Sequence, residues 1–145
     1  MKKILLFVLA AVFTASLVSA KDIITTDTGK LPQEAKNFIA AHFPKEKVSY
    51  IKIDDELLSK NYDVVLENGT EIEFYGNGDW KEVDAKLNNV PLAIVPERIQ
   101  EYVNRNFNGV TFKEIKKKKR TYEVKLSNRL ELEFNLDGNF IRIDD

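Results

Sequence analysis

YDVVLENGTEIEFYGNGDWKEVD, residues 62–84, returns in altered form as YEVKLSNRLELEFNLDGNFIRID, residues 122–144. At this offset of 60 positions, identical residues recur along both stretches. The identities are Tyr62/Tyr122, Val64/Val124, Leu66/Leu126, Asn68/Asn128, Glu71/Glu131, Glu73/Glu133, Phe74/Phe134, Gly78/Gly138 and Asp84/Asp144. Alternating apolar and polar residues, separated by turn residues, predict strands near 62–67, 70–75 and 79–84, and near 122–127, 130–135 and 139–144.

A helical pattern precedes each stretch. LPQEAKNFIAAHF begins at Leu31 and VPERIQEYVNRNF begins at Val95, and apolar residues recur in both at helical spacing. One further alternating segment follows each helix, VSYIKID from Val48 and VTFKEIK from Val110. The sequence therefore predicts an α+β fold: a tandem repeat of a helix plus a four-stranded antiparallel sheet, joined into one extended sheet with both helices on one face.

The repeat also sets the expected domain boundaries. Unit one spans residues 31–84, a linker spans 85–94, and unit two spans 95–145. Residues 21–30 are mostly polar and are expected to form a flexible lead. One helix over four strands buries little apolar surface, so we expect residues 31–145 to form a single domain with a shared core.

Alternation assigns the strand residues to the two faces of the sheet. The residues expected to face the helices are Ile51, Ile53, Tyr62, Val64, Leu66, Ile72, Phe74 and Val83 in unit one, and Ile115, Tyr122, Val124, Leu126, Leu130, Leu132, Phe134, Ile141 and Ile143 in unit two. The residues expected on the opposite, open face are Tyr50, Val65, Tyr75, Trp80, Phe112, Lys125, Phe140 and Arg142.

The first twenty residues have the pattern of a secretory signal peptide. Two lysines follow Met1, an apolar run covers residues 4–18, and small residues precede a cleavage point after Ala20. The run is shorter than the ~20 residues of a membrane span. We therefore expect an exported protein, periplasmic or secreted, without a membrane span after cleavage. Removing Lys2 and Lys3 changes the net charge from −1 to −3, which favours neither nucleic acid nor anionic lipid as a partner.

The composition argues against most catalytic and metal centres. The chain has no cysteine and one histidine, so a structural zinc site and a cysteine nucleophile are excluded. His42 lies at the border of a helix stripe and corresponds to Asn106, which indicates a polar helix-edge residue. The acidic residues 54–56 and the turn residues near 77 and 137 lack the spacing of a calcium-binding loop. We expect neither cofactor nor metal.

Paired glutamates are the one pattern typical of an enzyme. Glu71 and Glu73, and likewise Glu131 and Glu133, are two apart on a strand and face the same side, ~6–7 Å apart. This spacing overlaps that of glycosidases. An active site rarely occurs twice in a small domain, so we interpret them as solvated charges on a strand and expect no enzymatic activity.

The sharpest charge feature is the run Lys116, Lys117, Lys118, Lys119 and Arg120, in the first hairpin of unit two. It has two readings: a solvated hairpin tip that keeps a sheet edge from pairing, or a basic patch for an acidic protein or envelope glycan.

The turn motifs Gly78-Asp79-Trp80 and Gly138-Asn139-Phe140, the ELEF-type strand, the prolines at the helix starts and the signal sequence together resemble the PepSY-like, β-lactamase-inhibitor-like periplasmic proteins. The resemblance spans the chain after the signal sequence. It implies two helices on one side of a long antiparallel sheet whose other face is open. In similar β-lactamase inhibitors this open face and nearby loops grip the enzyme, but no residue here matches their contact loops.

Three functions are compatible with these features. The first is a non-enzymatic binding module that engages a protein or peptide of the cell envelope through the open face, with Tyr50, Tyr75, Trp80, Phe112, Phe140 and Arg142 as contact residues. These rings could instead be covered by one another, by the lead or by the linker. The second is a binder of a small ligand or envelope polymer in a groove between the units. The third is an enzyme that uses Glu71 or Glu73.

Overall fold

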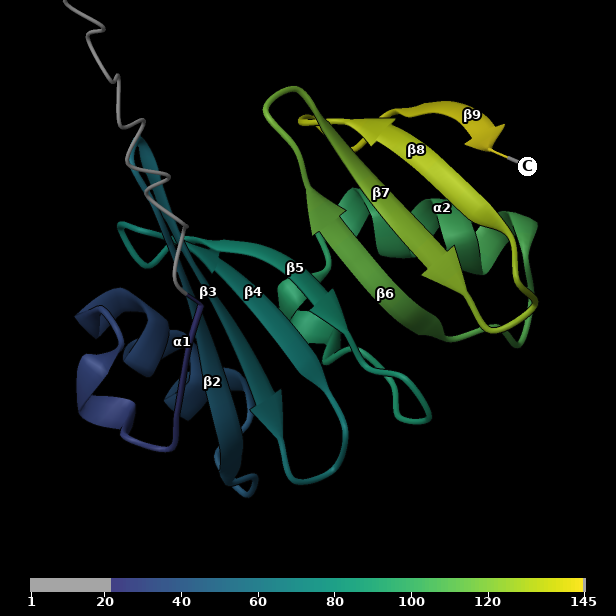
Figure 1. Cartoon of the computed structure of the whole chain (residues 1–145). Coiled ribbons are helices and arrows are strands. Elements are labelled where there is room, and N and C mark those ends of the chain that lie inside the picture. The colour runs from purple at the N-terminus through teal and green to yellow at the C-terminus, as the bar shows by residue number, and fades with distance from the viewer. Residues whose placement is uncertain (1–21, 145) are drawn as a thin grey trace, which may run out of the picture.

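The computed structural model describes residues 22–144, and the predicted signal peptide lies outside this range. The described chain forms a nine-stranded sheet whose strands follow one another in sequence order, every neighbouring pair antiparallel (Figure 1). The strands are β1 (Ile23–Thr25), β2 (Val48–Glu56), β3 (Ser59–Leu66), β4 (Glu71–Tyr75), β5 (Trp80–Asp84), β6 (Phe112–Lys117), β7 (Thr121–Leu126), β8 (Glu131–Asn135) and β9 (Phe140–Asp144). The helices are α1 (Gln33–His42) and α2 (Glu97–Asn106), with short 3₁₀ turns η1 (Thr28–Lys30) and η2 (Leu92–Ile94).

The α+β class and the antiparallel sheet predicted from the sequence are confirmed. Each α-helix is followed by four strands, as the alternating segments indicated. Among residues 22–144, no helix is long and apolar enough to cross a membrane.

The sequence predicts a flexible lead for residues 21–30, and this prediction is wrong for most of the segment. Ile23–Thr25 form β1, which pairs with residues 51–53 of β2, and Thr28–Lys30 form η1. Three β-branched residues in succession suit a strand, and they pair with the otherwise free edge of β2. The linker at 85–94 is also packed: Ala85, Val90 and Ile94 are buried.

The helices begin and end where the sequence predicts. Pro32 and Pro96 are the residues before the first helical turns, and Phe43 and Phe107 close the last turns with backbone hydrogen bonds to Ile39 and Val103. Proline suits these starts because the first helical N–H groups have no intrahelical partner.

One face of the sheet, called here the apolar face, carries a continuous row of buried residues. Residues directly opposite one another in an antiparallel sheet point to the same side. The paired positions in this row are Ile51, Val64, Ile72, Val83, Ile115, Val124 and Leu132, and none is more than 1% exposed. The expectation that these residues form the core is confirmed.

Each helix contacts a phenylalanine of the apolar face. Phe38 of α1 meets Phe74 of β4 edge-on at a centroid distance of 5.6 Å. Tyr102 of α2 meets Phe134 of β8 in the same way at 5.4 Å. Phe74 and Phe134 are fully buried, as predicted.

Ile143 lies on the apolar face opposite Leu132, as expected, but it is 44% exposed because β9 is the outermost strand of the described sheet and has a neighbour on one side only. Ile141 was also expected to face the helices, but it is 48% exposed and has no partner residue in the register of β8 and β9.

Bulges interrupt the alternation in equivalent strand pairs. Glu82 lies opposite Glu73, but Trp80 lies opposite Phe74, so Lys81 is an extra residue. The pair β8 and β9 has the same irregularity, with Ile141 as the extra residue. A bulge reverses the face assignment of every residue beyond it when that assignment is made by counting in twos.

Candidate functional site

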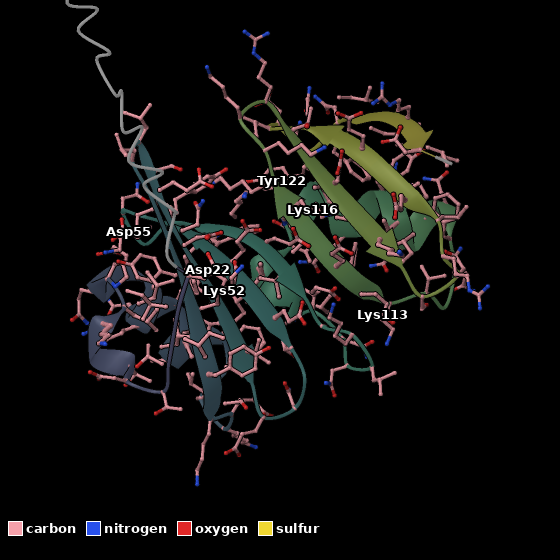
Figure 2. The ribbon with its side chains drawn as sticks, viewed as in Figure 1. Asp22, Lys52, Asp55, Lys113, Lys116 and Tyr122 are labelled. Atoms are coloured by element: carbon pink, nitrogen blue, oxygen red, sulfur yellow. The ribbon has the colours of Figure 1, made fainter. Side chains whose placement is uncertain are left out.

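The face opposite the apolar face, called here the charged face, is lined by ionisable side chains (Figure 2). One row of paired positions crosses from β2 to β9. It comprises Lys52, Asp63, Glu73, Glu82, Lys116, Glu123, Glu133 and Arg142. Carboxylates outnumber cations in this row, so the face presents a negative surface with interspersed positive charges.

A depression of about 280 Å³ lies on this face over β2 to β5. We call it the acidic depression. Its lining residues are Tyr50, Lys52, Asp63, Val65, Glu71, Ile72, Glu73, Glu82 and Asp84. Five of the nine are acidic, with one lysine among them, so a ligand with positive charge is electrostatically complementary.

Lysines at the border of the acidic depression form ion pairs with several of its carboxylates. Lys86 Nζ lies 3.0 Å from Glu71 and 2.7 Å from Asp84, and Lys81 pairs with Glu73. The side chains of both lysines are more than one third exposed. A basic partner would compete with flexible, exposed lysines, which lose little when they are displaced.

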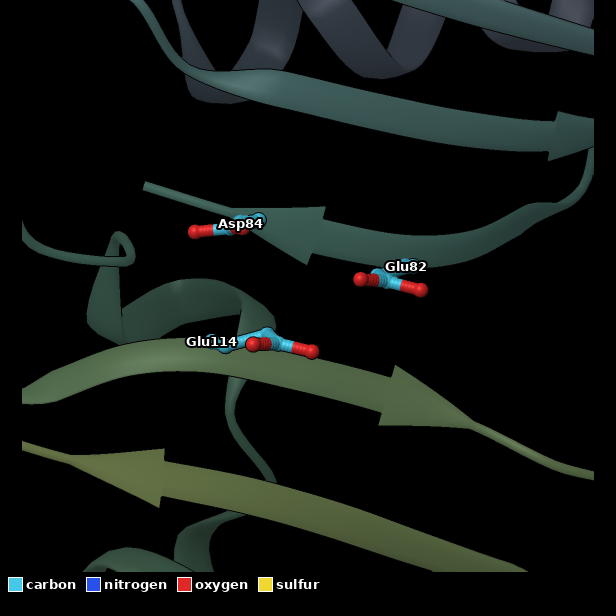
Figure 3. Close-up of side chains that lie close together, drawn as sticks. All are labelled: Glu82, Asp84 and Glu114. Carbon is cyan, nitrogen blue, oxygen red and sulfur yellow. The ribbon is translucent and has the colours of Figure 1, made fainter. Parts of the chain in front are cut away.

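A cluster of three carboxylates adjoins the depression at the junction of β5 and β6 (Figure 3). One oxygen each from Glu82, Asp84 and Glu114 lie within 4.8 Å of one another. Lys116 Nζ approaches Glu114 at 2.9 Å and Glu82 at 3.7 Å. The cluster exists because the register of β5 and β6 places Glu114 directly opposite Asp84, with Glu82 two residues along β5 on the same face.

Burial raises the pKa of Glu82 to about 7, and a hydrogen bond with Glu114 contributes to the shift. Burial also raises the pKa of Asp63, and the nearby charge of Glu73 adds to it. A cation that binds at these groups must displace the proton of a protonated carboxyl, so its arrival lowers their pKa. The acidic lining of the depression is suited to binding a cation.

Tyr50, Tyr75 and Arg142 lie on the charged face, as their spacing predicted. Tyr50 lines the depression, and Lys81 Nζ lies 5.8 Å from the centroid of the Tyr75 ring. Arg142 forms ion pairs with Glu133, at 2.8 Å, and with Asp144. Arg142 is four strands from the depression, so it does not join the two tyrosines in one site.

The other three predicted contact residues, Trp80, Phe112 and Phe140, were assigned to the wrong face. Trp80 stacks on Phe38 of α1 at 5.9 Å, and Phe140 stacks on Tyr102 of α2 at 4.7 Å. Phe112 is only 4% exposed. The cause in each case is a bulge next to the residue: at Lys81 for Trp80, at Ile141 for Phe140 and at Lys113 for Phe112.

The basic hairpin does not form one patch. Lys116 points into the carboxylate cluster, Lys117 Nζ lies 5.8 Å from the Trp80 ring centroid, and Lys118 pairs with Glu123. Lys119 and Arg120 are exposed at the tip. The run divides because successive strand residues point to opposite faces.

The paired glutamates all take part in ion pairs, three of them with residues on neighbouring strands and Glu71 with Lys86 in the turn after β5. Glu71 and Glu73 bind the lysines named above, Glu131 pairs with Lys125 at 3.4 Å, and Glu133 pairs with Arg142. His42 packs against Phe38 at 4.6 Å at the end of α1, and burial lowers its pKa. These contacts fit the structural interpretation of both motifs.

Sequence reasoning missed the carboxylate cluster. Glu114 is thirty residues from Asp84, and only the β5–β6 register brings them together. At the offset of 60 residues, Glu82 corresponds to Arg142 and Asp84 to Asp144. Comparison of the two units would therefore have marked Glu82 as different, but it would not have shown that Asp84 and Glu114 lie beside it. The groove expected between the units is not where the depression lies, since its lining comes from residues 50–84.

The fold and this face define a small α+β protein with a negatively charged open sheet surface. The family described as "Putative beta-lactamase-inhibitor-like, PepSY-like" matches residues 60–142. The chain belongs to this PepSY-like family.

Solved structures support the same assignment. A "putative calcium-regulated periplasmic protein" of Bacteroides thetaiotaomicron is 43% identical, with a TM-score of 0.79, and the match covers 86% of this chain and 96% of that one. A "putative periplasmic protein" of the DUF2874 family from Bacteroides vulgatus is 39% identical, with a TM-score of 0.81, over 88% and 99% of the two chains. A second protein of that species, described as periplasmic and of unknown function, is 39% identical with a TM-score of 0.82, over 86% and 100%. The protein is periplasmic, like these relatives. A comparison with curated proteins gave no match.

Proposed function

We propose that the protein is a non-enzymatic periplasmic binding module whose charged face engages a protein or peptide of the cell envelope. The acidic depression, with Tyr50 in its lining, is the observation that carries this proposal. A tyrosine beside carboxylates is typical of sites that bind lysine or arginine side chains, because the ring covers the aliphatic part while the carboxylates bind the charge. The partner segment therefore carries basic residues.

The arrangement of the two units supports an open binding face. Phe38 and Tyr102 contact the same face of the sheet, so we infer that both helices cover the apolar face of a tandem repeat and leave the charged face free. Tyr50 and Tyr75 remain about 40% exposed there. Exposed aromatic rings among charges are typical of binding surfaces.

Capture from periplasmic extract tests the proposal. We expect a basic envelope protein to be retained by the wild type and lost with Glu71→Lys, which reverses a charge in the depression. Glu131→Lys is the matched control, because Glu131 is the equivalent position in unit two and lies outside the depression. Capture that is equally strong with all three forms would overturn the proposal.

A second candidate is binding of a divalent cation, and the carboxylate cluster favours it. Calcium prefers six to eight oxygen ligands, and three carboxylates supply up to six. The relative from Bacteroides thetaiotaomicron is described as calcium-regulated. Lys116 and Lys86 now neutralise the cluster, and both would have to move away from an arriving cation.

Calorimetric titration with calcium chloride distinguishes the two candidates. A cation bound at the cluster should give a saturable signal that Glu114→Gln abolishes and Glu131→Gln preserves. Absence of a saturable signal with the wild type would rule out the cation while leaving the peptide proposal unaffected.

The alternative from the sequence was a small ligand or envelope polymer bound in a groove between the units, whereas the depression lies over β2 to β5. Ligand pockets measure roughly 300–1,000 Å³, and the depression approaches that lower limit. Retention of an envelope glycan, with no protein captured, would favour this alternative.

A further inference from the structure

The outer edge of β9 is an unpaired strand edge with apolar side chains. β9 is the last strand of the sheet that residues 22–144 form. Phe140, Ile141 and Ile143 are 36%, 48% and 44% exposed. An exposed apolar edge strand is prone to pair with another strand, because its N–H and C=O groups have no partners.

The equivalent strand of unit one shows what covers such an edge. β5 occupies the same position in unit one as β9 does in unit two, and β6 pairs with it through Glu82 with Lys116, Val83 with Ile115 and Asp84 with Glu114. Val83 is thereby fully buried, whereas its counterpart Ile143 is not. The same strand position is thus completed in one unit and left open in the other.

We propose that β9 pairs antiparallel with β9 of a second copy of this chain, about a two-fold axis through Ile143. In this register Arg142 of each copy lies opposite Asp144 of the other on the charged face. Ile143 of each copy meets Ile143 of the other on the apolar face, and extends the row that ends at Leu132. The pairing surface lies apart from the acidic depression, so this dimer is independent of the proposed function.

Charge complementarity selects this register and this occupant. An axis through Arg142 would set two arginines against each other, which is unfavourable. With the axis at Ile143, Arg142 of each copy exchanges its ion pair with Asp144 of its own chain for one with Asp144 of the other copy, and it keeps its 2.8 Å contact with Glu133. A strand that is complementary to itself in both charge and apolar character fits a second copy.

The opposite edge of the described sheet is a shorter strand, although Ile23 and Ile24 are exposed there. β1 has three residues, and its flanking Asp22 is held by Lys52 at 3.1 Å. Short edge strands flanked by charges resist pairing. Ile23 of β1 is 40% exposed on the apolar face, opposite Ile53, so it provides a matched control for Ile143.

Sedimentation equilibrium of the protein purified from periplasmic extract tests the dimer. The wild type should pass from monomer to dimer as its concentration rises, because one strand pair is a small interface. Ile143→Lys should raise the dissociation constant roughly tenfold or more, and Ile23→Lys should leave it unchanged. A wild type that stays monomeric throughout, or equal dissociation by both variants, would overturn the proposal.

A charge-reversal pair tests the register and guards against a variant that merely unfolds. Arg142→Asp alone and Asp144→Arg alone should each be monomeric, since each opposes like charges across the axis. An equimolar mixture should form heterodimers, because every pair is then between opposite charges. Mixing that restores no dimer, although both variants keep a cooperative unfolding transition, would refute the axis through Ile143.

Discussion

Gly78 and Gly138 show how one residue fixes the contact between a turn and a helix. Both have positive φ, at +90° and +83°. A Cβ at Gly78 would lie 2.9 Å from side-chain atoms of Pro32 and Glu34, and one at Gly138 would lie 2.7 Å from Arg98 Cβ. The turn therefore needs glycine for two reasons: the backbone has a positive φ, and the start of the helix leaves no room for a side chain.

Alanine substitution at these glycines should separate the two requirements. Gly69 has φ +89° but nothing within 4 Å of its Cβ position, so Gly69→Ala measures the backbone term alone, about 1–2 kcal/mol. Gly138→Ala should cost roughly 1–3 kcal/mol more, from the added overpacking. Urea unfolding measures both values. Equal losses would mean that the helix start moves aside freely.

Glu82 should make stability depend on pH. Its pKa, near 7 in the folded protein, lies above the ordinary value of 4.5 because burial and the hydrogen bond with Glu114 favour the protonated form. The folded state therefore holds a proton that the unfolded chain has lost, and stability falls as pH rises from about 4.5 to about 7.

Replacing Glu82 removes this dependence. Glu82→Gln keeps a donor for Glu114 and should stabilise the protein at pH 8 by about 1–2 kcal/mol, since solvent reaches part of the side chain, with little effect at pH 4.5. Chemical unfolding at the two pH values is the measurement, with Glu131→Gln as the control. A gain of the same size at pH 4.5 would show that its origin is not the ionisation of Glu82.

At the scale of elements, the sequence predicts what depends on local pattern and fails where register decides. Phe74 and Phe134 follow unbroken alternation, and their burial could be predicted. Trp80, Phe112 and Phe140 lie next to bulges, and a single extra residue reverses the count. The carboxylate cluster could not be predicted because it needs the alignment of β5 with β6, which no local signal encodes. β1 was missed because three residues carry too short a pattern.

The new position of Trp80 changes the expected effect of its substitution. Trp80 lies between Phe38 of α1 and Tyr122 of β7, at centroid distances of 5.9 and 6.5 Å. Trp80→Ala should cost roughly 2–4 kcal/mol, slightly less than a fully buried ring. Phe140→Ala should cost less, because β9 is the outermost strand of the sheet that residues 22–144 form. Fluorescence of Trp80, the only tryptophan, should be blue-shifted and shielded from quencher. A red-shifted, readily quenched signal would mean that Trp80 is not packed between Phe38 and Tyr122.

At the scale of the whole molecule, the apolar face is one core that passes through the junction of the units. Val83 of β5 is buried where it lies opposite Ile115 of β6, and the Tyr122 ring stacks on Trp80. The linker closes the same junction, since backbone hydrogen bonds join Ala85 to Lys113 and Val90 to Phe112. The strands β1 to β5 thus bury part of their apolar surface against β6 and β7.

A fragment ending at residue 87 should therefore fold poorly. Residues 22–87 keep α1 and strands β1 to β5, but lose the cover over Val83 and Trp80 and leave β5 as an apolar edge. A chain of this length buries only about 60% of the surface of its unfolded form, less than a larger domain does, so the loss of one strand contact and one aromatic contact removes a large share of a net stability of about 5 kcal/mol. We expect weak, non-cooperative unfolding by circular dichroism. Adding residues 88–144 as a separate chain should restore a cooperative transition, because the β5–β6 pairing and the Trp80–Tyr122 contact can form again. A fragment that unfolds sharply by itself, and gains nothing from the second chain, would show that the two units have separate cores.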